Sequence, residues 1–219
     1  MPSENVENYL NRIYTLQLGE GRVSTSSLSE KLQISPASVT EMVKKLAEDG
    51  SVVYTPYKGV ELTEHGRKKA VRIIRRHRLW ELFLVRVLKY RWDEIHEEAE
   101  RLEHSTSEKL EKRLDELLGH PKIDPHGDAI PTMGGVVHGE DALSLTDVIA
   151  GSRVIVRRVS DEDPEILKYA ARLGITLNKR LAVREKILFD GSLRVDIGGK
   201  ERFISSRLAQ NIFVEPVDA

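Results

Sequence analysis

Hydrophobic positions in the first fifty residues recur at helical spacing in three short segments. Residues 4–18 place apolar side chains three and four positions apart, and residues 28–32 repeat the pattern briefly. A third segment begins at Ser35 and ends at Asp49–Gly50. Ser35 is a favourable N-cap, and Pro36 fits the first helical position, where a missing N–H costs nothing. The pattern predicts three helices, of which the last two are joined by a tight turn.

Two short alternating runs follow, Val52–Tyr54 and Val60–Leu62, and they predict a β-hairpin. A helix-turn-helix followed by a hairpin indicates a winged helix. In this motif the second helix of the helix-turn-helix, here the one that begins at Ser35, meets base edges in the major groove of DNA. A small helical domain with an incidental hairpin is the alternative that this pattern leaves open. The side chains that we expect at DNA are Ser35, Pro36, Ala37, Ser38, Thr40, Glu41, Lys44 and Lys58.

The distribution of charge agrees with a DNA-binding N-terminal part. Residues 1–92 hold 16 Lys and Arg against 10 Asp and Glu, whereas residues 93–219 hold 18 against 25. The two parts therefore carry +6 and −7, although the whole chain carries only −1. A basic segment favours contact with a polyanion, but charge runs also occur on solvated faces, so this observation alone decides little.

The centre of the chain concentrates potential metal ligands at helical spacing. His77 and Glu81 lie four residues apart, and a second stripe combines His96, Glu100, Glu103 and His104. At 100° per residue the second stripe occupies about a third of a helix circumference. Imidazole and carboxylate ligands suit Mn²⁺, Fe²⁺, Co²⁺ or Zn²⁺. One such pair is usually a solvated helix face, but two stripes on adjacent helices favour a metal site.

Composition narrows the class of protein further. The 219 residues include no cysteine, which excludes disulfides and thiolate metal sites. No apolar run is long enough to span a bilayer, and no signal peptide is recognisable at the start. We therefore expect a cytoplasmic protein that does not contact a membrane.

Residues 105–118 predict a continuation of the helical part, with a leucine stripe that fits either a core or a dimer interface. From Leu143 the pattern changes to short strands with Asp-Gly and Gly-Gly turns, which predicts a β-barrel. One helix, from Asp163–Pro164 to Leu173, interrupts the strands. The predicted strands are Arg153–Val159, Arg180–Val183, Lys186–Phe189, Leu193–Ile197, Arg202–Ile204 and Ile212–Val214.

The order of these segments resembles a known family. A winged helix followed by RRHRLWE, IHEEAERLEH and HPKIDPHGDAIP is similar to the diphtheria-toxin-repressor and manganese-transport-regulator family of metal-dependent transcriptional regulators. The resemblance implies an α+β multidomain fold with a winged helix-turn-helix at 1–73, a helical metal-binding and dimerisation domain at 74–140, and an SH3-like (FeoA-like) β-barrel at 141–219. Such proteins are homodimers that bind double-stranded operator DNA when Mn²⁺ or Fe²⁺ is present, and they usually repress metal-uptake genes.

The resemblance also implies two groups of metal ligands. The primary site draws on His77, Glu100, Glu103 and His104, plus a first-helix residue that matches Asn8 here. The family typically has Asp or Met at that position, and an amide is a weaker, neutral ligand. The second site is expected to use Glu81, His96, Asp124, His126 and Asp161.

The resemblance favours a manganese-responsive repressor, with an iron-responsive repressor as the alternative. Zn²⁺ or Co²⁺ would substitute in vitro. A binuclear metallohydrolase is a different class, disfavoured because no HExxH motif is present and a winged helix would lack a purpose. A winged-helix regulator with a purely structural metal is a third reading. Metal dependence of operator binding separates the three.

Overall fold

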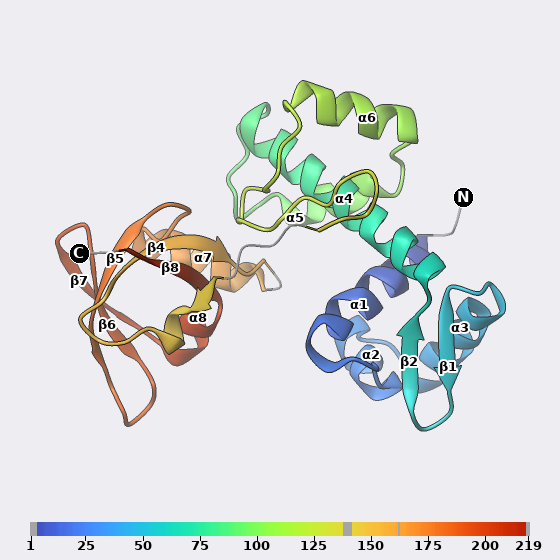
Figure 1. Ribbon diagram of the computed structural model, residues 1–219, viewed down its shortest axis with the longest axis horizontal. Coiled ribbons are helices and arrows are strands. Elements are labelled where there is room, and N and C mark those ends of the chain that lie inside the picture. The colour runs from blue at the N-terminus through green and yellow to red at the C-terminus, as the bar shows by residue number, and fades with distance from the viewer. Residues whose placement is uncertain (1–3, 138–141, 162, 218–219) are drawn as a thin grey trace. The chain divides into compact units, whose positions relative to one another are not determined.

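A computed structural model describes residues 4–137, 142–161 and 163–217 (Figure 1). The chain forms two compact units. The first unit contains Met1–His77, Arg101–Glu111 and Pro131–Val137, and the second contains Arg78–Glu100, Lys112–Ile130 and His138–Ala219. Among the described residues, no helix is both long and apolar enough to cross a bilayer.

The N-terminal part of the first unit is a winged helix, as the sequence predicts (Figure 1). Ser24 and Ser35 cap the second and third helices, because their hydroxyl oxygens accept hydrogen bonds from the backbone N–H groups of Ser27 and Ser38. The hairpin pairs Val52 with Leu62, and its strands enclose the turn that carries Lys58. The elements are α1 (Glu4–Glu20), α2 (Thr25–Leu32), α3 (Pro36–Glu48), β1 (Val52–Thr55) and β2 (Gly59–Leu62).

The helical segment contains α4 (Glu64–Arg86), α5 (His96–Glu103) and α6 (Glu108–Leu117). The predicted helix over residues 105–118 is present as α6, but the prediction that it continues the preceding helix is wrong, because α5 ends at Glu103 and α6 begins only at Glu108. The Thr106 hydroxyl donates to the Leu102 carbonyl at 2.7 Å, and the Ser107 hydroxyl accepts from the Leu110 N–H at 3.2 Å. These local hydrogen bonds compete with a continuous helix and favour a break.

Three arginines in the basic half of α4 share one carboxylate of α6. The fully buried carboxylate of Glu111 lies 3.3 Å from the Nε atoms of Arg72 and Arg75 and 3.0 Å from Nε of Arg76. Arg75 also donates to the Pro131 carbonyl at 2.6 Å. Three of the 16 basic residues counted in residues 1–92 therefore make contacts inside the protein, and their charge is not a measure of DNA contact.

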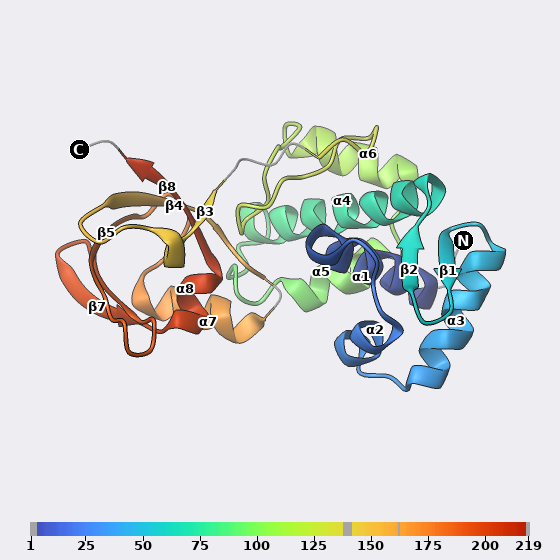
Figure 2. The ribbon, with the colours of Figure 1, turned by 60° about the horizontal axis from the view of Figure 1, so that its bottom comes forward.

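The C-terminal part forms a six-stranded antiparallel sheet with the order β3-β8-β4-β5-β6-β7, which is the SH3-like domain that the sequence predicts (Figure 2). Alternate side chains face its aliphatic core, as in Val154 and Val156. Asp163 caps α7 by accepting from the Glu165 N–H. The elements are β3 (Leu143–Ser144), η1 (Leu145–Asp147), β4 (Arg153–Val159), α7 (Pro164–Leu173), β5 (Arg180–Lys186), β6 (Leu193–Ile197), β7 (Lys200–Ile204), α8 (Ser206–Gln210) and β8 (Ile212–Val217).

One predicted strand in this domain is wrong. Lys186–Phe189 is not a separate strand, because β5 runs unbroken to Lys186 with a register shift between Val183 and Glu185. Leu188 and Phe189 lie beyond the strand and are more than nine-tenths exposed. The bulge keeps β5 paired with β6 for longer than the alternation of residue types suggests.

Candidate metal centre

A carboxylate from the first helix meets a histidine at the end of α5. The Oε2 atom of Glu7 lies 2.6 Å from Nδ1 of His104, and both side chains are about nine-tenths buried. Glu7 belongs to α1, whereas His104 directly follows the last residue of α5. Because both residues belong to the first unit, this contact joins the winged helix to the helical segment within one compact body.

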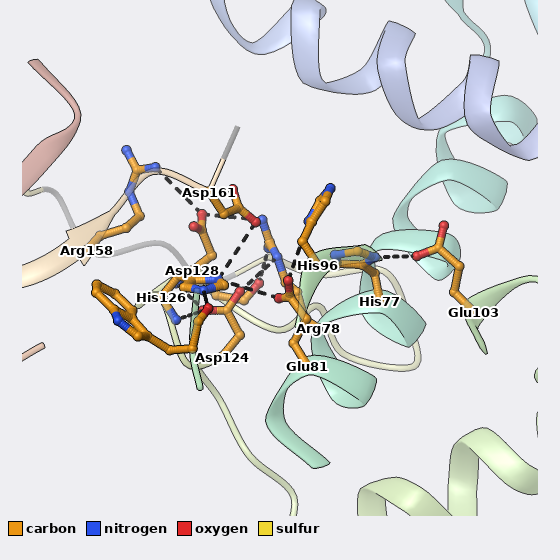
Figure 3. Close-up of polar contacts among 12 residues, drawn as sticks. His77, Arg78, Glu81, His96, Glu103, Asp124, His126, Asp128, Arg158 and Asp161 are labelled. Atoms are coloured by element: carbon orange, nitrogen blue, oxygen red, sulfur yellow. Dashed lines mark hydrogen bonds and ion pairs between the residues drawn. The ribbon is translucent and has the colours of Figure 1, made fainter. Parts of the chain in front are cut away.

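Glu103 extends this contact to α4. Its Oε2 atom lies 2.5 Å from Nδ1 of His77 (Figure 3). Its Oε1 atom lies 3.5 Å from Nε2 of His104. Glu103 is only 2% exposed. The four side chains therefore form a chain of alternating carboxylates and imidazoles, which we call the Glu7–His77 chain: Glu7, His104, Glu103 and His77.

Two residues that are expected in the primary site do not belong to the Glu7–His77 chain. Glu100 is exposed on α5, and Asn8 is partly exposed on α1 beside Glu7. The sequence analysis missed Glu7, although a signal was present. Glu7 is spaced three residues before Leu10 and seven before Tyr14, so it occupies the apolar stripe of an amphipathic helix. A carboxylate in such a position is buried and needs a partner.

In the second unit, the structure brings together the predicted ligands of the second site around Glu81 on α4. Its Oε1 atom lies 3.6 Å from Nδ1 of His96, and its Oε2 atom lies 3.7 Å from Nδ1 of His126. The Oδ2 atom of Asp161 lies 3.9 Å from the same His126 nitrogen (Figure 3). One ligand atom each of Glu81, His96 and Asp161 falls within 4.8 Å of the others, and the same holds for Glu81, Asp124 and His126.

Backbone contacts explain why residues far apart in sequence meet here. The N–H of Val159, the last residue of β4, donates to the His126 carbonyl at 2.9 Å, so the strand that leads to Asp161 lies against the loop. Gly127 permits this approach, because a Cβ at that position would lie 2.0 Å from the Arg157 carbonyl oxygen. The loop and the strand therefore hold His126 and Asp161 together.

A second contact orients the His126 ring. Its Nε2 atom lies 2.8 Å from the Trp92 carbonyl oxygen. A carbonyl only accepts hydrogen bonds, so Nε2 carries a proton, and Nδ1 is the nitrogen that faces Glu81 and Asp161 and would offer its lone pair to a metal once its own proton has left. A ligand histidine is commonly fixed in this way by a hydrogen bond from its other nitrogen.

The electrostatics of this cluster favour a bound cation. Burial lowers the pKa of His126, but the carboxylates of Glu81, Asp124 and Asp161 outweigh burial and raise it to about 9. Burial, together with the nearby carboxylates of Asp128 and Glu81, raises the pKa of Asp124. Protons therefore stabilise this crowded group of carboxylates, and a divalent cation would do the same with more charge.

Asp124 is held rigidly. Its Oδ1 atom accepts from the backbone N–H groups of His126 at 2.8 Å and Asp128 at 2.9 Å, which shapes the loop. Its Oδ2 atom lies 3.5 Å from Nε of Arg78. Within the described part of the chain, the buried ligand atoms that lack a hydrogen-bond partner include Nε2 of His104, Nδ1 of His126 and Oδ2 of Asp124. Nitrogen and oxygen donors left in this way fit a divalent metal.

The side chains expected at DNA gather around the start of α3 and the hairpin turn. Ser35, Pro36, Ala37 and Ser38 are exposed, and the Thr40 hydroxyl donates to the Pro36 carbonyl at 2.8 Å. Lys44 and Lys58 are also exposed. Glu41 instead forms an ion pair with Lys45 at 2.8 Å, so its carboxylate is balanced by its own helix.

Three family models together match nearly the whole chain. Residues 1–60 match the N-terminal DNA-binding domain of iron-dependent repressors, and residues 63–132 match their metal-binding and dimerisation domain. Residues 143–216 match the FeoA domain. The helix-turn-helix, helical and SH3-like parts of the fold correspond to these three matches.

Curated relatives and solved structures agree. The iron-dependent repressor IdeR of Mycobacterium leprae is 31% identical, with 98% of each chain covered. The HTH-type transcriptional regulator MntR of Lysinibacillus sphaericus is 36% identical over 54% of this chain and 84% of its own. A manganese-dependent transcriptional repressor in complex with manganese has a TM-score of 0.90 at 42% identity, covering 97% of this chain and all of the other.

Proposed function

Because this chain belongs to the iron-dependent repressor family of metal-dependent DNA-binding repressors, we propose that it is a manganese-responsive repressor of metal-uptake genes. It acts in the cytoplasm as a homodimer on double-stranded operator DNA. Family members are transcriptional repressors and not enzymes, so the hydrolase alternative is set aside.

The observation that carries this proposal is the convergence of nitrogen and oxygen ligands without sulfur around Glu81. Carboxylate and imidazole ligands suit Mn²⁺, and they also accept Fe²⁺. The solved structure with manganese at 42% identity favours Mn²⁺, whereas the relationship to an iron-dependent repressor keeps Fe²⁺ as the alternative. A bound divalent cation would supply the positive charge that protons supply in the metal-free protein.

We assign the candidate ligands to two metal sites. Glu81, His96, Asp124, His126 and Asp161 hold one cation in the second unit. Glu103 and His104, with His77 and Glu7, hold the other in the first unit. Glu7 takes the role that the resemblance gives to Asn8, because its carboxylate already contacts His104. Glu100 joins only if α5 or its side chain turns inward, since it is exposed here.

The proposed effect of the metal follows from the position of Glu7. This residue lies on the first helix of the winged domain, so a cation shared by Glu7 and His104 fixes that domain against α5. A fixed orientation lets the two winged helices of a dimer reach successive major grooves. The exposed leucines of α6, Leu110 and Leu117, are the surface that we propose for the dimer contact.

One assay tests the proposed function. DNA selected from random duplexes by the Mn²⁺-loaded protein is titrated with protein in the presence of Mn²⁺, Fe²⁺ or Zn²⁺, beside a chelator control. We expect specific binding with Mn²⁺ and its loss with chelator. Binding that persists in chelator would support a structural metal instead, and activation by Fe²⁺ alone would identify an iron-responsive repressor.

A further inference from the structure

The outer face of the SH3-like sheet carries a hollow that the metal-dependent function does not use. It measures about 360 Å³ and lies over β4, β5 and β6, beside the Gly198–Gly199 turn and Val217. Ligand pockets start at roughly 300 Å³, so its size suits a small molecule. Three arginines are among the residues that line it, Arg153, Arg180 and Arg184, and we call it the arginine hollow.

The strand register places two of these arginines on the same face. Arg153 pairs with Ala182, and Ile155 pairs with Arg180, so Arg153 and Arg180 are diagonal neighbours across β4 and β5. Residues in this relation lie about 7–8 Å apart, within reach of long side chains. The next residue on each strand, Val154 after Arg153 and Leu181 after Arg180, faces the core and is at most 2% exposed. The two strand segments that carry these arginines are therefore well packed.

The charges of the hollow do not cancel. Asp196 is its acidic member, and its carboxylate accepts from Arg184 at 2.9 Å and from the Gly199 N–H at 2.8 Å. Arg153 and Arg180 have no carboxylate partner among residues 4–137, 142–161 and 163–217. An anion between them would find two guanidinium groups that no carboxylate of the described residues already holds.

We propose that the arginine hollow binds a small dianion, of the phosphate or dicarboxylate class. Guanidinium groups form paired, parallel hydrogen bonds with either kind of oxyanion, which a single ammonium group does not. Arg153 and Arg180 bind the two charged ends or oxygens, while Arg184, already held by Asp196, bounds the site. Its volume of about 360 Å³ is of the size that a small ligand fills.

The test uses the full-length, metal-free protein and two probes, inorganic phosphate and succinate, in separate calorimetric titrations. At least one probe is expected to bind, and the Arg153→Gln/Arg180→Gln double variant is expected to lose about tenfold or more in affinity. The matched control is Arg172→Gln, which removes an exposed arginine of α7 outside the hollow and should leave affinity unchanged.

A second variant guards against a folding defect in the double variant. Ala182→Glu keeps all three arginines but adds a carboxylate on the floor of the hollow, so it should also abolish binding. Circular dichroism confirms that each variant is folded. The proposal is overturned if neither probe binds the wild type, or if Arg172→Gln loses as much affinity as the double variant. It is also overturned if the double variant and Ala182→Glu keep the wild-type affinity for both probes and bind only duplex DNA more weakly. None of these outcomes depends on Mn²⁺ activation.

Discussion

The Oε2 atom of Glu7 on α1 lies 2.6 Å from Nδ1 of His104, which follows the last residue of α5. The neighbouring Asn8, which the family resemblance marks as the first-helix ligand, is partly exposed. If the contact marks a metal ligand, Glu7→Gln should weaken Mn²⁺ binding by about tenfold or more, because it removes a negative charge from a cation site. Calorimetric titration measures this affinity directly.

Asn8→Ala is the matched control for that experiment, since it alters the adjacent residue of the same helix. We expect Asn8→Ala to change Mn²⁺ affinity little. The reverse result, with Asn8→Ala impaired and Glu7→Gln unaffected, would return the ligand role to Asn8 and leave Glu7 as a buried partner of His104.

The raised pKa of His126 predicts how Mn²⁺ binding at the second site depends on pH. With a pKa of about 9, the metal-free ring is protonated at neutral pH, and the cation must displace that proton. Asp124, whose pKa is raised to about 8 by burial and by nearby carboxylates, must lose its proton as well, so apparent affinity should rise more than tenfold per pH unit below pH 8, about tenfold between pH 8 and 9, and level off above pH 9. Affinity rises with pH, and does not fall, because the neutral imidazole is the form that binds a metal. Titrations in buffers of different ionisation enthalpy count the protons released.

The raised pKa of His126 also makes the stability of the metal-free protein depend on pH. Whereas Mn²⁺ affinity rises with pH, this contribution to the free energy of unfolding falls. Because the folded pKa of His126 lies above its unfolded value, this stabilisation is complete below about pH 6.5 and is lost as pH rises through 9. Chemical denaturation across this range, with and without His126→Gln, measures it. A wild type and variant that lose stability in parallel between pH 7 and 9 would show that His126 does not titrate as described.

Lys44 and Lys45 on α3 should differ in their effect on DNA binding. Lys45 forms an ion pair with Glu41 at 2.8 Å, whereas no ion pair is seen for Lys44, the exposed residue directly before it, among the described residues. Lys44→Ala should weaken binding to specific and random DNA alike and lower the salt slope by about one per subunit, as a lost phosphate contact does. Lys58→Ala at the hairpin turn should do the same. Lys45→Ala serves as the control, and an equal fall in salt slope for Lys45→Ala contradicts the assignment.

Glu111 is predicted to be a stability residue. Its fully buried carboxylate contacts three arginines of α4, so Glu111→Gln removes the negative charge that these guanidinium groups share. Breaking such a buried network costs about 3–5 kcal/mol. Glu116→Gln on the same helix removes a surface pair with Arg113 and should cost less than about 1 kcal/mol. Urea denaturation compares the two, and equal losses would show that the buried network adds nothing.

Local signals made much of the fold predictable. Ser35, Pro36 and Asp163 act through their own backbone neighbourhood, so caps and helix starts follow from short stretches of sequence. The break between α5 and α6 was missed, because the Thr106 and Ser107 hydroxyls had to outcompete a favourable leucine stripe. The length of β5 depends on a bulge, which alternation of residue types does not reveal.

The ligands around Glu81 were predictable from the sequence, whereas the first-helix carboxylate of the other group, Glu7, was not. The resemblance named Glu81, His126 and Asp161 together, and the structure places them close to one another. Glu7 was missed because its role depends on how α1 docks against the end of α5, a contact across 97 residues of sequence. The division of the chain at residues 73 and 140 stays a prediction.

The central claim, that metal occupancy is coupled to DNA binding, is tested most directly by measuring Mn²⁺ affinity with and without saturating specific DNA. Coupling between two sites is reciprocal, so DNA must tighten Mn²⁺ binding by the factor by which Mn²⁺ tightens DNA binding. We predict a clear increase in Mn²⁺ affinity for the wild type and a smaller one for Glu7→Gln. An Mn²⁺ affinity that is the same with and without DNA would contradict the account.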